Sequence, residues 1–124
     1  MPSRRDTTAD VESFLPLPAM TFHILLALQD EERHGYAIMK EVAEQTSDSV
    51  RLGPGTLYGT LKRLREAGLV EESAERADPE IDDERRRYYR LTKLGVAVAR
   101  ADAKRMEAMV QAAQRKRLLT VRPA

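Results

Sequence analysis

Apolar residues recur at helical spacing in three segments of the first half of the chain. The first segment opens at Pro18 and is so apolar over residues 22–28 that we expect neighbours on most sides of it. The second covers residues 34–46. The third runs from a turn at Gly53 to Gly68, which favours a left-handed helix cap. The pattern predicts three helices joined by short links, with the first at the centre of the core.

The pattern changes in the second half of the chain from helical spacing to short strands. Residues 69–70 and 87–92 contain aromatic and aliphatic side chains typical of strands, and residues 71–84 between them form an acid-rich loop. Successive side chains of a strand point to opposite faces, so one of Tyr88 and Tyr89 should be buried, although the sequence leaves open which. Two strands joined by such a loop indicate a β-wing.

A long last helix is predicted over residues 93–117, with Thr92 as its N-cap. One face of this helix carries an apolar stripe, which Arg105 interrupts. Few residues remain in the chain to cover this stripe, so we expect it to contact the same helix of a second copy. Packing against the first helix of its own chain is the alternative. The expected dimer-interface residues are Leu94, Val98, Ala101, Met109 and Ala112.

The order helix, helix, helix, strand, loop, strand, helix defines the expected fold class. It is mainly α with a small β-wing, namely a winged helix-turn-helix followed by a C-terminal dimerisation helix. We expect a flexible N-terminal arm over residues 1–16, which are polar and lack periodicity, and a winged helix-turn-helix DNA-binding domain over residues 17–92. The dimerisation helix covers residues 93–117, and residues 118–124 form a tail.

Composition narrows the class of protein. A chain of 124 residues is most simply one domain, and the absence of cysteine excludes disulfides, a thiolate nucleophile and a cysteine zinc site. The net charge of +1 argues against a nonspecific polycation, so any basic surface has to be local. No apolar run approaches the roughly 20 residues that cross a bilayer, and the first residues lack the apolar core of a secretion signal. We therefore expect a cytoplasmic protein without a membrane partner.

The third predicted helix combines an apolar stripe with an outward face that suits a DNA groove. Thr56 and Tyr58 stand at its start, where backbone N–H groups favour a phosphate and hydroxyls reach base edges. Lys62 and Arg63 follow one turn on and can reach phosphates. The alternatives are that Thr56 caps the helix, that Tyr58 packs on it and that the cations form a solvated face. The residues expected to point outward are Thr56, Tyr58, Thr60, Lys62, Arg63 and Arg65.

The wing carries the densest positive cluster of the chain, Arg85, Arg86 and Arg87. Arginines are favoured where a wing approaches the minor groove or its flanking phosphates. Eight acids over residues 71–84 could instead pair with these arginines or repel DNA. Because exposed ion pairs contribute little, we expect at least Arg86 to be free to contact DNA.

Three groups of residues, in this order, resemble the PadR family of transcriptional regulators. They are His34-Gly35-Tyr36; Gly55-Thr56-Leu57-Tyr58 with Leu61-Lys62-Arg63-Leu64 and Gly68-Leu69-Val70; and Arg87-Tyr88-Tyr89 with Leu91-Thr92 and Gly95. The resemblance implies a homodimeric repressor that binds double-stranded operator DNA and often releases it on binding a small hydrophobic or aromatic effector. It adds Gly55 to the DNA-contacting residues. It also adds Tyr36, whose family counterpart touches the phosphate backbone, with core packing as the alternative.

The chain departs from the family pattern at three points. Gly59 stands where the family usually has proline, and it lowers helix propensity by roughly 1 kcal/mol relative to alanine. Ala37 replaces an acid that commonly follows the His-Gly-Tyr group. Some drug-binding members use a tryptophan in the dimer pore, and this chain has none. The identity of an effector therefore does not carry over.

Other chemistry finds little support in the sequence. The two histidines, His23 and His34, have no acids at the helical spacing of a metal site, and the turn at Gly53 lacks the lysine of a phosphate-binding loop. No catalytic constellation or cofactor motif is evident, so we expect no enzyme. The hypothesis is a sequence-specific DNA-binding transcriptional regulator, in the form of a ligand-responsive repressor that binds a palindromic operator as a homodimer. The alternative is a winged-helix protein-interaction module that binds no operator.

Overall fold

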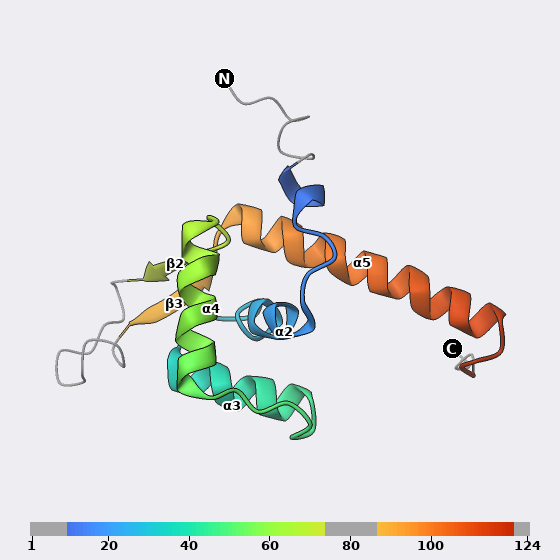
Figure 1. Ribbon diagram of the computed structural model, residues 1–124, viewed down its shortest axis with the longest axis horizontal. Helices are drawn as coiled ribbons and strands as arrows, with labels where there is room; N and C mark the ends of the chain where they lie inside the picture. The colour runs from blue at the N-terminus through green and yellow to red at the C-terminus, as the bar shows by residue number, and fades with distance from the viewer. Residues whose placement is uncertain (1–9, 74–86, 121–124) are drawn as a thin grey trace.

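The computed structural model describes residues 10–73 and 87–120 (Figure 1). Its helices and strands are α2 (Ala19–Ala27), β1 (Arg33–His34), α3 (Gly35–Gln45), α4 (Pro54–Glu66), β2 (Val70–Ser73), β3 (Tyr88–Leu91) and α5 (Lys93–Arg115). This order confirms the expected fold class, a mostly helical chain with a small antiparallel sheet.

The sheet has one strand more than the sequence predicted. Its order is β1-β3-β2, with Arg33 opposite Tyr89 on one side of β3 and Val70 opposite Leu91 on the other. The extra strand, β1, has only two residues, which is too short to show an alternating pattern. It ties the start of α3 directly to the base of the wing.

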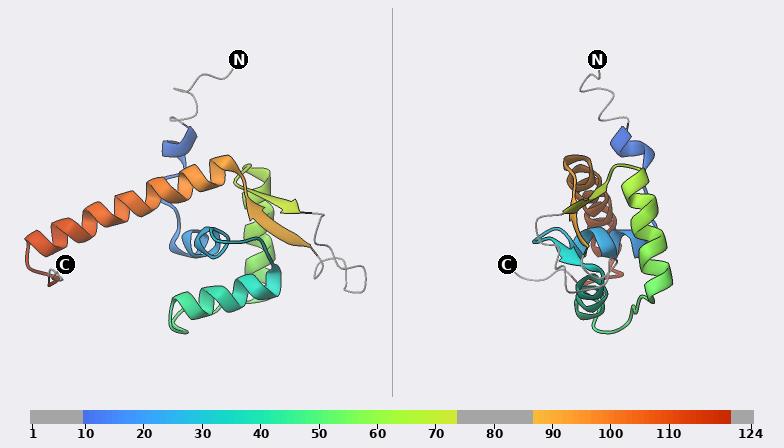
Figure 2. Two further views of the ribbon diagram at one scale, coloured as in Figure 1. Left: turned by 180° about the vertical axis from the view of Figure 1, so that it is seen from behind. Right: turned by 90° about the vertical axis from the view of Figure 1, so that its left-hand side faces the viewer.

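Helix α2 lies between α3 and α5, as expected for the centre of the core (Figures 1 and 2). Ile24, Leu25 and Ala27 of this helix are completely buried. They join buried aliphatic side chains of α3, α4 and α5 in one hydrophobic cluster. The covering is incomplete, because Leu26 is 42% exposed.

The N-terminal segment differs from the expected arm. Residues 1–9 lie outside the described residues. Residues 10–13 are helical, Val11, Phe14 and Leu15 pack against the core, and Leu17 is buried. The expectation of an arm is therefore wrong for residues 10–16, where the apolar residues are too few to show a period but are sufficient to hold the segment on the core.

Two side-chain caps fix the helix starts. The Nδ1 atom of His34 accepts a hydrogen bond of 3.2 Å from the N–H of Ala37 and so caps α3. The Oγ1 atom of Thr92 accepts a hydrogen bond of 3.0 Å from the N–H of Gly95, which confirms Thr92 as the N-cap of α5. Gly68, with φ of 81°, ends α4 in the predicted left-handed conformation.

Helix α5 divides into two parts. Its first half packs on α2 of the same chain, whereas its second half extends away from the other helices (Figure 1). Val98 is completely buried and Leu94 packs partly against the core, whereas Met109 is 53% exposed. Val98 is thus covered within its own chain, which supports the alternative to the dimer contact at this position. Ala101 and Ala112 are half-buried.

The interruption of the apolar stripe by Arg105 has a structural reason. Asp102 is buried in the contact of α5 with the core, and the Nε atom of Arg105 donates a hydrogen bond of 2.7 Å to its carboxylate. A buried carboxylate without such a partner would be strongly destabilising. Arg105 thus belongs with Asp102, one helical turn away.

Of the six glycines, Gly95 leaves the least room for a side chain. A Cβ atom at Gly95 would overlap the carbonyl oxygen of Leu69, whereas a Cβ at Gly59 in α4 would meet only ordinary van der Waals contact. We predict that Gly95→Ala lowers the free energy of unfolding by about 2 kcal/mol. The matched variant Gly59→Ala should raise it by roughly 0.5–1 kcal/mol, because alanine is the better helix former. Urea unfolding followed by circular dichroism at one protein concentration measures both, and equal effects would contradict the close approach at Gly95.

Candidate nucleic-acid interface

The first turns of α3 and α4 meet at one corner of the molecule, beside the hairpin of β2 and β3 (Figures 1 and 2). Their contact depends on Gly35, because a Cβ atom at this position would overlap the hydroxyl of Tyr58. Tyr58 is half-buried and packs against the core cluster. The alternative that Tyr58 packs within the protein is thus supported. Its ring lies between α4 and the start of α3.

Tyr36 occupies the first turn of α3 and is 70% exposed. The alternative that it packs in the core is therefore wrong. Its ring lies 6.4 Å from the ring of His34, measured between centroids. An exposed phenol at this corner can donate a hydrogen bond to a phosphate oxygen.

The start of α4 is open to solvent. Gly53 is the N-cap and provides no side-chain hydrogen bond, and the first turn contains no acid. Because Gly53 holds the cap position, the alternative that Thr56 caps the helix is wrong. Gly55 and Thr56 are exposed, and the N–H groups at this end of a helix have no intrahelical partner. The positive end of the helix dipole is thus available to an anion.

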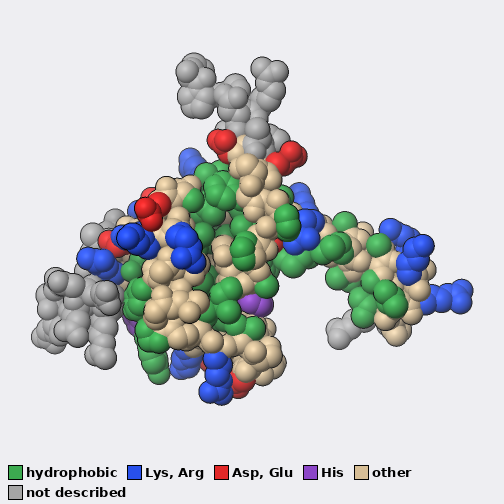
Figure 3. Space-filling model, in the orientation of Figure 1, with side chains coloured by type: hydrophobic (Ala, Val, Ile, Leu, Met, Phe, Trp, Pro, Cys, Tyr) green, Lys and Arg blue, Asp and Glu red, His purple; other side chains and the backbone are tan. Residues whose placement is uncertain are grey.

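Lys62 and Arg63 are exposed one turn further along α4. Neither forms an ion pair within the described part of the chain. The Nη2 atom of Arg63 donates a hydrogen bond of 3.2 Å to the Oγ1 atom of Thr60. Thr60 itself is buried and donates to the carbonyl oxygen of Thr56 at 2.8 Å, so the prediction that it points outward is wrong. Lys and Arg side chains are visible along α4 in Figure 3.

The arginines beside the sheet are paired with acids. Glu72 of β2 forms ion pairs with Arg65 of α4 and, at 3.6 Å, with Arg87. Glu71 accepts a hydrogen bond of 2.8 Å from the Nε atom of Arg90. The acids thus pair with Arg87 rather than leaving it free, while Arg85 and Arg86 lie outside the described residues.

The two wing tyrosines differ in burial, as the alternation of side chains along a strand requires. Tyr89 is buried, whereas Tyr88 is half-buried and meets His34 edge-on at 5.3 Å between ring centroids. Burial raises the pKa of Tyr89, and the nearby Glu72 and Tyr58 raise it further, against the smaller opposing effects of Arg65 and Arg87. Tyr89 lies in β3, and the groups that shift its pKa include Tyr58 and Arg65 of α4.

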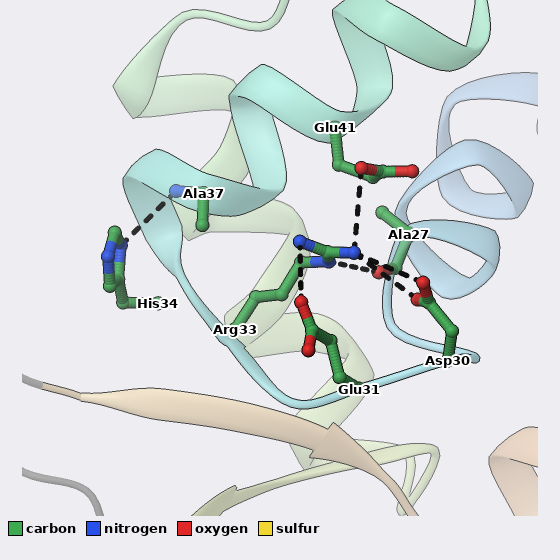
Figure 4. A network of polar contacts seen from close by, with 7 residues as sticks. All are labelled: Ala27, Asp30, Glu31, Arg33, His34, Ala37 and Glu41. Atoms are coloured by element: carbon green, nitrogen blue, oxygen red, sulfur yellow. Dashed lines mark hydrogen bonds and ion pairs between the residues drawn. The ribbon is translucent and has the colours of Figure 1, made fainter.

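The sequence analysis did not predict the contacts of Arg33, which lies close to this corner (Figure 4). Its side chain is only 14% exposed, and its Nε atom donates a hydrogen bond of 2.8 Å to the carbonyl oxygen of Ala27. Its guanidinium also forms ion pairs with Asp30 at 3.3 Å, Glu31 at 3.2 Å and Glu41 at 3.5 Å. The acidic run that directly precedes Arg33 was the available sequence signal.

The described residues show no metal site. They contain no group of three or more histidine, cysteine or acidic side chains that could hold a metal ion. Among these residues there is also no helix with the length and apolar character needed to cross a membrane.

Comparison with known proteins gives a consistent result. Residues 24–101 match the family model described as the transcriptional regulator PadR-like family. The chain is 36% identical over 93 residues to the transcriptional regulator Rv3488 of Mycobacterium tuberculosis, a match that covers 75% of this chain and 80% of that protein. An uncharacterised protein of Lysinibacillus sphaericus is 35% identical over 74 residues, which are 60% of this chain and 65% of that protein, just under two thirds of its length.

A solved structure gives the same result for the fold. The crystal structure of a PadR family transcription regulator from Clostridium difficile superposes with a TM-score of 0.64 at 25% identity. The superposition covers 82% of this chain and 100% of that one. The family, Rv3488 and the Clostridium difficile protein are transcriptional regulators and not enzymes.

The two tyrosines of the corner should respond differently to truncation. We predict that Tyr36→Ala changes the free energy of unfolding by less than about 0.5 kcal/mol, because the side chain is exposed. Tyr58→Ala should lower it by about 2 kcal/mol, because it leaves a gap between α4 and Gly35. Chemical denaturation followed by circular dichroism distinguishes them. A large loss for Tyr36→Ala would show that this ring contributes to the fold.

Proposed function

The chain belongs to the PadR-like family of transcriptional regulators, and from this premise we propose that it is a repressor that binds operator DNA as a homodimer. The observation that carries the proposal is the uneven pairing of charge around α4. Lys62 and Arg63 have no acidic partner in the described part of the chain, whereas Arg65 and Arg87 beside the sheet share Glu72. The unpaired cations lie on the helix whose open start favours an anion.

In the proposed complex α4 lies in the major groove of DNA. The second helix of a helix-turn-helix pair occupies this position, and its first residues contact base edges. Thr56 can reach bases or, through its N–H group, a phosphate, while Lys62 and Arg63 bind phosphates. Tyr36 donates to the backbone from α3. Arg85, Arg86 and Arg87 of the wing remain proposed contacts beside the minor groove, where Arg87 would have to exchange Glu72 for a phosphate.

The proposed dimer contact uses the second half of α5. Its exposed apolar side chains include Met109 and Val110, and Ala112 on the same half is partly open to solvent. Pairing of this half with its copy would cover these side chains. A two-fold axis there relates two reading helices, so the operator should be palindromic. Ala101 borders this contact, whereas Leu94 and Val98 serve the core of their own chain.

A small hydrophobic or aromatic effector has a candidate place between α2 and α5. A pocket of about 190 Å³ opens there, lined by Phe22 and Leu26 of α2 and by Val96, Ala99 and Ala103 of α5, with Gln29 and Arg100 at the side. An apolar pocket at the contact of two helices suits such a ligand. Because α5 also carries the proposed dimer contact, occupation of this pocket can change the spacing of the two reading helices.

Operator binding should depend steeply on salt. Lys62 and Arg63 of two subunits release about 0.9 counterions for each phosphate contact. We predict that Lys62→Ala weakens binding to operator and to random DNA alike and reduces the salt slope by about one unit per site. Thr56→Ala should weaken operator binding more than random binding. Titration of a fragment from upstream of the gene at several salt concentrations measures these effects.

Lys104→Ala is the matched control, because this lysine is exposed on α5 ahead of the residues of the proposed dimer contact and should leave the slope unchanged. A wild-type chain that shows no preference for any fragment from its gene region over random DNA would contradict the regulator proposal. That result would favour the alternative of a protein-interaction module.

We expect that truncation of the chain before residue 107 removes dimerisation without loss of folding. Deletion of residues 107–124 retains Val98 and the pair of Asp102 with Arg105, so we predict a folded monomer that loses operator binding. Met109→Glu should shift the full chain toward monomer by placing a charge in the contact. Val98→Asp should instead unfold it, because this position belongs to the core. Sedimentation at micromolar concentration, with circular dichroism as the folding control, measures both, and a deletion variant that stays dimeric would contradict the proposed role of α5.

A further inference from the structure

A groove with a volume of about 360 Å³ follows one face of α3 and is closed on one side by the link to α4. Tyr36 and Lys40 line it from α3, and Asp48 and Arg51 line it from the link. The other lining residues are apolar. Tyr36 is the same exposed side chain that marks the corner of α3 and α4, so the groove begins at the proposed DNA interface and continues along α3 away from α4.

The charges of this groove leave it open to an anion. Lys40 is exposed and forms no ion pair within the described part of the chain. Arg51 is 79% exposed, and its guanidinium lies 3.7 Å from the carboxylate of Asp48, which is 68% exposed. An exposed pair at this distance contributes little, so Arg51 can exchange Asp48 for a stronger partner. Two cations thus face one acid.

The position of the groove points to one kind of anion. Arg51 lies two residues before Gly53, the N-cap of α4. It is therefore next to the helix start that the proposed complex places in the major groove. In a helix-turn-helix pair the first helix crosses the sugar-phosphate backbone while the second enters the groove. A phosphate strand leaving the start of α4 would therefore run along the face of α3 that carries Tyr36 and Lys40.

We propose that this groove holds the phosphodiester backbone of DNA, with Lys40 and Arg51 as phosphate contacts that extend the contact of Tyr36. The inference rests on the proposed function and adds to it a second set of anchors away from the reading helix. The two cations make no base contacts, so they set affinity and register but not sequence preference. Asp48 opposes them, because it holds Arg51 and repels phosphate.

The test uses the full-length chain and the DNA fragment for which the wild type shows preference, together with random duplex DNA. Lys40→Ala and Arg51→Ala should each reduce the salt slope by about one unit per subunit and weaken both DNAs by the same factor. Arg51→Lys should retain the slope. Asp48→Asn should strengthen binding to both DNAs, an effect of opposite sign that damage to the fold would not produce. Asparagine suits this position because the backbone φ there is 66°.

Lys104→Ala on α5 is the matched control, because this lysine is exposed but lies far along the chain from the groove. The inference would be overturned if Lys40→Ala and Arg51→Ala bound DNA with the salt slope of the wild type. If Lys62→Ala reduced that slope in the same experiment, the proposed function would remain intact. A changed ratio of operator to random affinity would also overturn it, because it would mean that the groove reads sequence. A wild-type chain that binds no DNA would overturn both.

Discussion

The arrangement of the helices depends on the hydrogen bond and ion pairs of the Arg33 guanidinium. Arg33 joins the carbonyl oxygen of Ala27 at the end of α2 to Glu41 in the middle of α3, while its backbone pairs with β3. A guanidinium this buried must keep its partners, because their loss would leave an uncompensated charge. The next residue, His34, caps α3 and packs against Tyr88. Two neighbouring side chains thus fix the angle between α3, the core and the wing.

The distribution of charge explains how a nearly neutral chain can present a basic surface. Acids of β2 pair with Arg65, Arg87 and Arg90 beside the sheet, so the wing base adds little net field. Lys62 and Arg63 on α4 are left without acidic partners in the described residues. A surface of this kind limits nonspecific attraction to DNA and leaves unpaired cations on the outward face of α4. Net charge alone was therefore a poor guide to the proposed binding surface.

Local pattern predicted helices α2 to α5, the caps at Gly68 and Thr92, and the fold class, because periodicity and capping residues act within a few positions of one another. It did not predict β1, which has no period of its own and exists because β3 offers it a partner. It also failed for Thr60, which is buried, and it left open whether Val98 belongs to the core of its own chain. Tyr36 and Tyr58 could not be told apart in sequence. Only the close approach of Gly35 decides which of the two rings is covered.

Helix α5 is one continuous helix that links the two proposed tasks of the chain, DNA binding and dimerisation. Its start is fixed by Thr92, whose hydroxyl bonds to the carbonyl oxygen of Gly68, and by the close contact of Gly95 with Leu69, so it moves with the end of α4. Its second half carries the exposed Met109. In a homodimer of the proposed kind, a continuous helix would convert a small change in the angle at α2 into a larger displacement of the reading helices. A ligand in the pocket between α2 and α5 would act on the contact between these two helices, which sets that angle.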